Sequence, residues 1–169
     1  MYEHEESIQG DNNRLIDAII DQLPIHSARN KNEHEYKVAI SDLLAQNNFL
    51  VVGLERGPYR LNLLREHNRM VFEVFDKDGV FVCRKSIFVR PFRKVLSEYY
   101  VLCENYADAI KASSPSQIQL TDVGRRNVHD EGAARLQNCL LEIVKMDQST
   151  ARKLFTILFL LYSKLPQVQ

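Results

Sequence analysis

Apolar residues recur at three- and four-residue steps between Pro91 and Ala112, which places them on one stripe of an α-helix. The stripe consists of Phe92, Val95, Leu96, Tyr99, Leu102, Cys103, Tyr106 and Ile110. Pro91 suits the first helical position, where a missing N–H loses no intrahelical bond. The pattern predicts one long helix against which the rest of the chain packs.

Four short runs rich in β-branched and aromatic residues precede this helix. They are Phe49–Leu54, Tyr59–Leu64, Met70–Phe75 and Val80–Phe88. Turn residues separate them, and the loop Asp76-Lys77-Asp78-Gly79 is typical of a hairpin because glycine adopts the left-handed conformation readily. Connections this short favour antiparallel neighbours, so we expect an antiparallel meander covered on one face by helices.

Two segments before these runs have less uniform patterns. The periodicity of Leu15–Leu23 fits either a helix or a strand. Residues 33–46 are helical in spacing, and Asn47 and Asn48 predict where that helix stops, since asparagine tolerates the left-handed cap conformation.

Helical patterns also follow the long helix. A capping box at Ser114–Gln117 predicts a helix start, with Pro115 at the first position. Gly124 and Gly132 predict a helix break between them. Another helical pattern runs through Leu136–Val144.

The last helical pattern, Leu154–Tyr162, is apolar nearly all round, and Asp147 or Ser149 would cap its helix. Such a helix is typical of a core position or of half of a dimer interface. A homodimer through this C-terminal helix is therefore one expectation.

The length of 169 residues and the content of 45% apolar and 26% charged residues fit one globular domain. We expect a flexible acidic arm at residues 1–13 and a single α+β domain over 14–169. An antiparallel sheet of four or five strands at about 49–88 would pack against a layer of C-terminal helices at about 91–164.

Composition also bounds the location of the protein. Three cysteines without a CxxC pair or zinc-finger spacing indicate no metal site, and no cofactor is indicated. The odd number favours a reducing compartment. The polar, acidic N-terminus excludes a signal peptide, and the most apolar run, residues 154–165, is too short to span a membrane. We expect a cytoplasmic protein without a membrane partner.

The densest polar cluster is GRRNVHDEG, residues 124–132. Arg125 and Arg126 offer forked donors suited to a phosphate or carboxylate, and His129 can share that anion or act as an acid or base. Glu131 can orient these groups. The alternative is a charged corner whose Arg–Glu pairs join two helices.

Catalytic signatures such as a Walker loop, GxGxxG, GxSxG or HExxH are absent. The five histidines are scattered along the chain. His129 is therefore the only candidate catalytic residue, and an enzyme is the less favoured interpretation.

A second candidate surface is basic. Residues 1–54 hold nine acids and four bases, whereas residues 55–94 hold five acids and ten bases. The basic strip comprises Arg56, Arg60, Arg65, Arg69, Arg84, Lys85, Arg90, Arg93 and Lys94, of which Arg60, Arg90, Arg93 and Lys94 form the secondary patch. If Tyr59, Phe72 or Phe81 share its face, the strip would resemble a single-strand nucleic-acid platform. Alternatively, it is a solvated rim attracted to the acidic N-terminal third.

Several strings stand in order: Gly57-Pro58-Tyr59-Arg60-Leu61, Pro91-Phe92-Arg93, Pro115-Ser116-Gln117-Ile118, Gly124-Arg125-Arg126 with His129-Asp130-Glu131-Gly132, and Ala151-Arg152-Lys153-Leu154-Phe155-Thr156. Together they resemble a small alphaproteobacterial family, catalogued as an uncharacterised protein family numbered two-six-two, over roughly residues 14–163.

The resemblance implies a compact cytosolic bacterial protein with no assigned activity, substrate or cofactor, and a fifth strand at Leu15–Leu23. Asp130 stands where the family has asparagine and Asn127 where it has glycine, which argues against a role that needs a carboxylate at 130. Arg125, Arg126, His129 and Glu131 match the family.

Three functions follow as hypotheses. The first is a non-enzymatic binding or regulatory protein that recognises an anionic small molecule or protein partner at Arg125, Arg126, His129 and Glu131. The second is a small hydrolase or transferase acting on a phosphorylated substrate with His129 as acid/base. The third is a nucleic-acid binder that uses basic residues 56–94.

Overall fold

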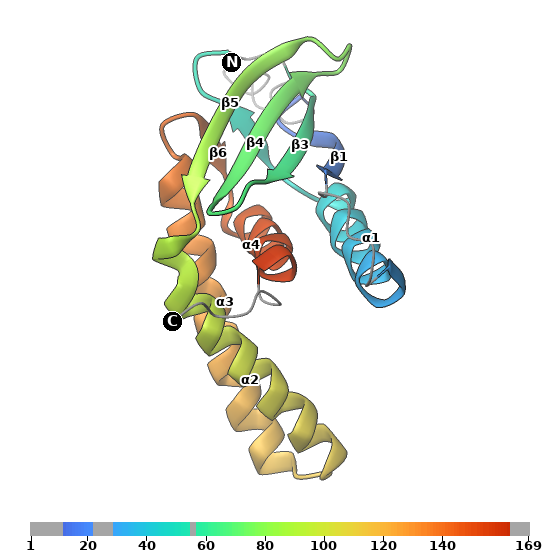
Figure 1. The fold of residues 1–169 in the computed structure, drawn as a ribbon, viewed down its shortest axis with the longest axis vertical. Coiled ribbons are helices and arrows are strands. Elements are labelled where there is room, and N and C mark those ends of the chain that lie inside the picture. Colours follow the sequence, from blue (N-terminus) through green and yellow to red (C-terminus); the bar gives the residue numbers. More distant parts are fainter. Residues whose placement is uncertain (1–11, 22–28, 55–56, 163–169) are drawn as a thin grey trace, which may run out of the picture.

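Four strands form the main sheet of the computed structural model, which describes residues 12–21, 29–54 and 57–162 but no side chains of residues 29–32. In the order in which they pair, they are β1 (Leu15–Asp21), β3 (Tyr59–Arg65), β4 (Arg69–Asp76) and β5 (Phe81–Phe88) (Figure 1). β3, β4 and β5 are antiparallel neighbours, as predicted. The Asp76 carboxylate accepts hydrogen bonds from the N–H groups of Asp78 and Val80, and Gly79 has φ of +82°, so the predicted hairpin loop is confirmed.

β1 resolves the ambiguous segment as a strand, which pairs parallel to β3 with Ala18 opposite Leu61 and Ile20 opposite Leu63. The sheet is therefore mixed. The expectation that short connections give antiparallel neighbours does not apply to this pair, because helix α1 (Arg29–Ala45) lies between β1 and β3 in the sequence.

The predicted meander is wrong at its first strand. β2 (Phe49–Val51) lies outside the main sheet and pairs antiparallel with β6 (Val144–Met146). β1 occupies the edge of β3 that β2 would need. The Tyr59 hydroxyl closes the turn after β2, accepting from the Val51 N–H and donating to the Leu54 carbonyl, each at 3.3 Å.

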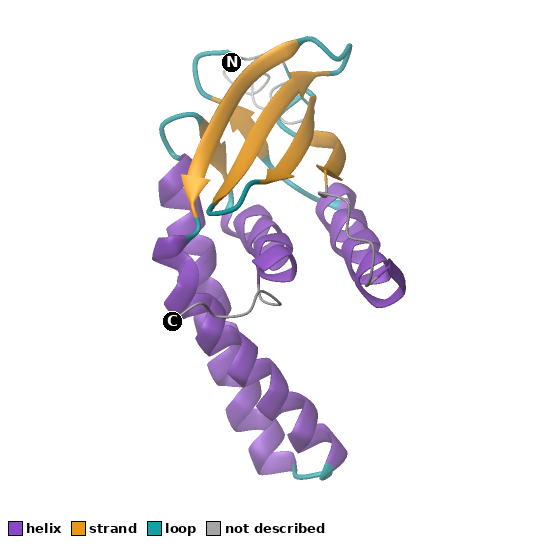
Figure 2. Cartoon of the chain, in the orientation of Figure 1, coloured by secondary structure: helices purple, strands orange, loops and turns teal. Residues whose placement is uncertain are grey.

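The helices after the sheet are α2 (Arg93–Lys111), α3 (Pro115–Leu140) and α4 (Gln148–Tyr162). A 3-10 turn, η1 (Arg90–Phe92), holds Pro91, so the α-helix begins slightly later than predicted. α2 and α3 run side by side away from the sheet (Figure 1). Figure 2 shows the strands gathered at one end of the molecule and this hairpin projecting from the other.

The predicted helix break between Gly124 and Gly132 is wrong, because α3 is continuous through both. The glycines serve close packing instead. A Cβ at Gly132 would overlap the ring of Phe155 in α4, and one at Gly124 would lie 3.2 Å from Leu102 Cδ2 in α2. A glycine inside a helix costs about 0.5–1 kcal/mol relative to alanine, which a close crossing offsets.

Two other helix-end predictions are confirmed in position and differ in mechanism. α3 begins after Ser114, but the Ser114 side chain makes no capping bond. α1 ends at Ala45, shortly before Asn47. The backbone of Asn47 is not left-handed; instead its side-chain amide donates a hydrogen bond to the Leu43 carbonyl. The helical pattern predicted through Val144 ends at Leu140, since Val144 begins β6.

α4 lies in the core. Eight of its residues are buried, including Leu154, Phe155 and Leu158. Asp147 caps it, since Asp147 Oδ1 accepts from the Thr150 N–H at 2.9 Å. Its apolar composition is thus explained within the chain, and the homodimer through this helix stays a prediction.

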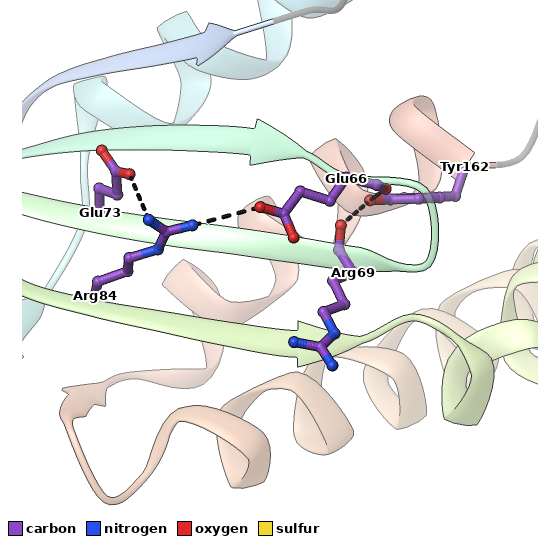
Figure 3. Close-up of polar contacts among 5 residues, drawn as sticks. All are labelled: Glu66, Arg69, Glu73, Arg84 and Tyr162. Carbon is purple, nitrogen blue, oxygen red and sulfur yellow. Dashed lines mark hydrogen bonds and ion pairs between the residues drawn. The ribbon is translucent and has the colours of Figure 1, made fainter.

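Two tyrosines fasten α4 to its surroundings. The Tyr162 hydroxyl donates to the Arg69 carbonyl at 2.6 Å and lies 3.2 Å from that of Glu66, at the turn between β3 and β4 (Figure 3). The Tyr36 hydroxyl of α1 donates to the Leu160 carbonyl at 3.0 Å. No described helix combines the length and apolar content needed to cross a membrane.

Candidate functional site

Arg125 and Arg126, the predicted anion-binding pair, share one carboxylate partner in α3. Arg125 Nη2 lies 2.7 Å from Asp122 Oδ1, and Arg126 Nη2 lies 3.0 Å from Asp122 Oδ2. These bonds lower the pKa of Asp122, chiefly through Arg125. Sequence reasoning overlooked Asp122, although its spacing of three and four residues from the arginines is that of helical ion pairs.

The two arginines also lie in different surroundings. The Arg125 guanidinium stacks over the Tyr106 ring of α2, with its carbon 4.6 Å from the ring centroid. The Arg126 side chain is 67% exposed. Arg125 therefore helps to join α2 to α3, and Arg126 faces solvent.

Glu131, the fourth predicted ligand residue, pairs with Arg135 one helical turn on, at 3.5 Å, with both side chains about half exposed. The structure therefore does not unite Arg125, Arg126, His129 and Glu131 in one cluster. The charged-corner alternative is wrong in its geometry too, since a single helix carries all four residues.

His129 is buried, with 8% of its surface exposed, and faces α4. Its Nε2 lies 2.9 Å from Thr156 Oγ1, and the Thr156 hydroxyl donates to the Arg152 carbonyl at 3.1 Å. With the hydroxyl proton directed at the Arg152 carbonyl, Thr156 Oγ1 accepts from His129, and the tautomer consistent with this arrangement carries the ring proton on Nε2. His129 Nδ1 is buried without a hydrogen-bond partner in the described part of the chain.

The surroundings of His129 keep it uncharged. Burial is the main cause that lowers its pKa to about 4; the cations Arg152 and Arg125 act in the same direction, and Asp130 opposes them. The rings of Tyr99 and Phe155 pack against it at centroid distances of 5.2 and 5.4 Å. A histidine with this pKa is poorly suited to exchange protons near neutral pH.

His129 and Thr156 form part of the wall of a pocket of about 400 Å³ between α3 and α4, which we call the α3/α4 pocket. Its other lining residues are Gln148, Ser149, Arg152 and Lys153. Two cations and no carboxylate thus line it. Arg152 Nη1 lies 2.8 Å from Asp130 Oδ1 of α3, and Lys153 Nζ donates to the Gln46 carbonyl at the end of α1.

Sequence reasoning missed Arg152 and Lys153 as site residues. A signal was available: both follow the helix-capping Asp147 by five and six residues, near the start of the predicted last helix. What could not be read from the sequence is that His129, in another helix, faces the same space.

The secondary basic patch is divided in space. Arg60 lies near the start of β3 and pairs in register with Phe75, at the sheet end that carries the 77–80 loop. Arg90, Arg93 and Lys94 follow the opposite end of β5 and are exposed. Lys94 Nζ also lies 3.9 Å from Glu98.

The proposed aromatic partners of this strip are divided as well. Tyr59 and Phe72 are buried at 0% and 2% exposure, and only Phe81 is exposed, at 55%. Arg84 bridges Glu66 and Glu73 at 3.4 and 3.6 Å (Figure 3). The outer sheet face thus mixes charges of both signs, which does not favour a nucleic-acid platform. Arg56 lies outside the described residues.

Comparison with known proteins places the chain in a family. The profile of the Uncharacterised protein family (UPF0262) matches residues 12–164. The chain belongs to this family. The resemblance predicted from its short motifs is therefore confirmed, and the family has no assigned function.

Similar proteins from alphaproteobacteria match most of the chain and most of their own length. A UPF0262 protein of Rhizobium meliloti (strain 1021) is 40% identical over 151 residues, covering 89% of this chain and 95% of that protein. One of Rhodospirillum rubrum is 38% identical over 160 residues, covering 95% and 99%. One of Rhizobium etli (strain CIAT 652) is 38% identical over 149 residues, covering 88% and 94%. No solved structure matches the chain.

Proposed function

We propose that the protein is a non-enzymatic binding or regulatory protein that takes an anion of the phosphate type in the α3/α4 pocket. The observation that carries this proposal is the lining: Arg152 and Lys153 beside the hydroxyl and amide groups of Ser149 and Gln148, with no acidic side chain. A phosphate group prefers such a set of donors and cations.

The position of the pocket adds to this preference. Gln148 and Ser149 are the first residues of α4, where the helix dipole favours negative charge. Arg152 is held by its ion pair with Asp130, so its guanidinium is oriented before any ligand arrives. His129 contributes a neutral wall, because its pKa of about 4 leaves it without charge at neutral pH.

The same geometry disfavours the hydrolase or transferase hypothesis. His129 Nε2 is hydrogen-bonded to Thr156, and Nδ1 is buried. Neither nitrogen is poised to take or give a proton in the pocket. The cytoplasm stays the proposed location, supported by three free thiols, Cys83, Cys103 and Cys139, which suit a reducing compartment.

Calorimetric titration with inorganic phosphate and pyrophosphate tests the proposal. We expect binding that Lys153→Gln weakens about tenfold and that Arg152→Gln abolishes, since each removes a cation from the lining. Arg126→Gln is the matched control: it removes an exposed arginine of α3 that does not line the pocket, and it should leave binding unchanged.

Two results would overturn the proposal. One is the absence of binding to either anion by the wild-type protein. The other is loss of binding in Arg126→Gln but not in Lys153→Gln, which would return the site to the arginine pair predicted from the sequence.

A further inference from the structure

The outer edge of β1 is unpaired by any strand of the described chain. β1 is the first strand in the order β1-β3-β4-β5 and pairs only with β3. At the start of β1, the Asn47 side chain hydrogen-bonds both backbone groups of Leu15. It accepts from the Leu15 N–H at 2.7 Å and donates to the Leu15 carbonyl at 3.1 Å. From Ile16 to Asp21 the described residues supply no further partner on that side. An exposed row of N–H and C=O groups is a template for another strand.

An apolar groove of about 810 Å³ runs beside this edge, between β1 and α1. Ala18, Ile19 and Ile20 line it from β1, and Tyr36, Ile40 and Leu44 are among the residues that line it from α1. Its charged lining residues, Glu33 and Lys37, pair with each other at 3.4 Å. The lining is thus apolar with no net charge, and it suits apolar side chains.

The register of β1 fixes which side chains an added strand would meet. Ala18 and Ile20 share the inner face with Leu61 and Leu63, toward the groove. Asp17, Ile19 and Asp21 alternate with them on the outer face, where Ile19 is 55% exposed and also borders the groove. An added strand would therefore place alternate residues against the groove and the residues between them opposite Asp17, Ile19 and Asp21.

Charge distinguishes two possible occupants of this edge, a second copy of the chain and a segment of another protein. Like charges that meet across a strand pair destabilise it, and acidic side chains on an edge strand discourage edge-to-edge association of identical chains. Asp17 and Asp21 form no ion pair within the described residues, and residues 1–54 hold nine acids against four bases. A second copy would bring the same acids, whereas a basic segment would match them.

We propose that a partner protein adds an extended segment to the free edge of β1, with apolar residues facing the groove and lysine or arginine facing Asp17 and Asp21. Backbone hydrogen bonds along β1 supply the affinity, and the groove and the two carboxylates supply the selection. The matching pattern is basic–apolar–apolar–apolar–basic, which reads the same in both directions and so fits either strand orientation.

Fluorescence anisotropy with a labelled peptide, Gly-Ser-Lys-Val-Ile-Val-Lys-Ser-Gly, tests the proposal. We expect binding, and a peptide with Glu in place of both Lys should bind at least about tenfold more weakly, as cross-strand charge pairs imply. The double variant Asp17→Asn/Asp21→Asn should weaken binding of the Lys peptide by about the same factor. Asp42→Asn, at an exposed acid of α1 that does not line the groove, should not.

Two N-methylated peptides separate strand addition from charge attraction. One peptide is N-methylated at the central Ile and the other at both Val residues. The two should differ in affinity, because alternate N–H groups of an added strand face β1 and only those that do so donate hydrogen bonds to it. Equal binding of both methylated peptides and the parent would overturn the proposal. So would the absence of peptide binding, or a dimer of the free protein, seen by analytical ultracentrifugation, that the Lys peptide dissociates; that dimer would assign the edge to a second copy.

Discussion

The two halves of α3 belong to one continuous helix and have different surroundings. From Pro115 to Val128 no residue is buried, and among the described helices and strands this part of α3 packs against α2 (Figure 1). From His129 to Leu140 five residues are buried, and α4 packs against this half as well. We call these segments the outer half and the inner half of α3.

Polar groups behave differently in the two halves. In the outer half, Asp122 binds two arginines of its own helix, Arg125 and Arg126. In the inner half, His129 and Asp130 bind Thr156 and Arg152 of α4. Local helix geometry organises the outer half, whereas contacts between helices organise the inner half. Substitutions of the same kind should therefore cost much more in the inner half.

Alanine substitution of the two glycines, Gly124 in the outer half and Gly132 in the inner half, should give the largest difference in stability. Gly132→Ala should lower the free energy of unfolding by about 3 kcal/mol, because the new methyl group overlaps the buried ring of Phe155. Gly124→Ala should change it by less than about 1 kcal/mol, since the flexible end of Leu102 can yield and alanine favours the helix. Urea unfolding of both variants measures the pair. Equal effects would show that the two helix crossings are equally tight.

These glycines also show the limit of sequence reasoning for the fold. Element types came from periodicity, which is a local property, so α2, β3, β4 and β5 were predicted close to their observed bounds. The pairing of β2 with β6, and of β1 with β3, depends on which edge is free in space, and no local pattern records that. A glycine in a helix carries the same ambiguity, because it marks either a break or a close crossing.

The candidate site was predictable only in part, for a similar reason. His129 was identified from the sequence and does line the α3/α4 pocket. Arg125 and Arg126 lie within four residues of it in the sequence, but both pair with Asp122 and neither lines the pocket. Arg152 and Lys153 reach the pocket from α4, more than twenty residues further on. Adjacency along the chain was a poor guide to adjacency across helices.

The buried imidazole should make stability depend on pH. In the folded protein, burial lowers the pKa of His129 from its ordinary value of 6.5 to about 4. Below pH 6.5 the unfolded chain therefore binds a proton that the folded protein does not, and stability falls as pH falls toward 4. This contribution amounts to about 2–3 kcal/mol between pH 7 and pH 4.

Urea unfolding of the wild type and of His129→Gln at pH 7 and pH 4.5 measures that contribution as a difference. The variant should lose less stability than the wild type on acidification. Parallel pH profiles of the two proteins would mean that the imidazole is solvated, and the contrast between the halves would weaken.

Two threonines give a smaller difference. Thr156→Val removes the acceptor of the buried His129 Nε2–H and should cost about 1–2 kcal/mol, because that donor is then unpaired. Thr121→Val is the matched change in the outer half, where the hydroxyl donates to the Gln117 carbonyl of its own helix at 2.7 Å. It should be close to neutral. Thr156→Ser keeps the hydroxyl and should restore most of the loss, whereas a loss that serine does not restore would point to the methyl group instead.

Two aspartates give the smallest difference. Asp130→Asn breaks the ion pair with Arg152 that joins α3 to α4, whereas Asp122→Asn breaks pairs within the outer half of α3. The pKa of Asp122 is lowered mainly by Arg125, so its contribution is present above the ordinary carboxyl pKa and is lost as pH falls below it. Ion pairs within one helix stabilise weakly and are screened by salt. We therefore expect Asp122→Asn to lower the melting temperature less than Asp130→Asn at neutral pH, with the effect of Asp122→Asn vanishing at high salt. If Asp122→Asn lowers the melting temperature more than Asp130→Asn, the outer half depends on its arginines for more than local pairing. That result would favour a functional role for Arg125 and Arg126.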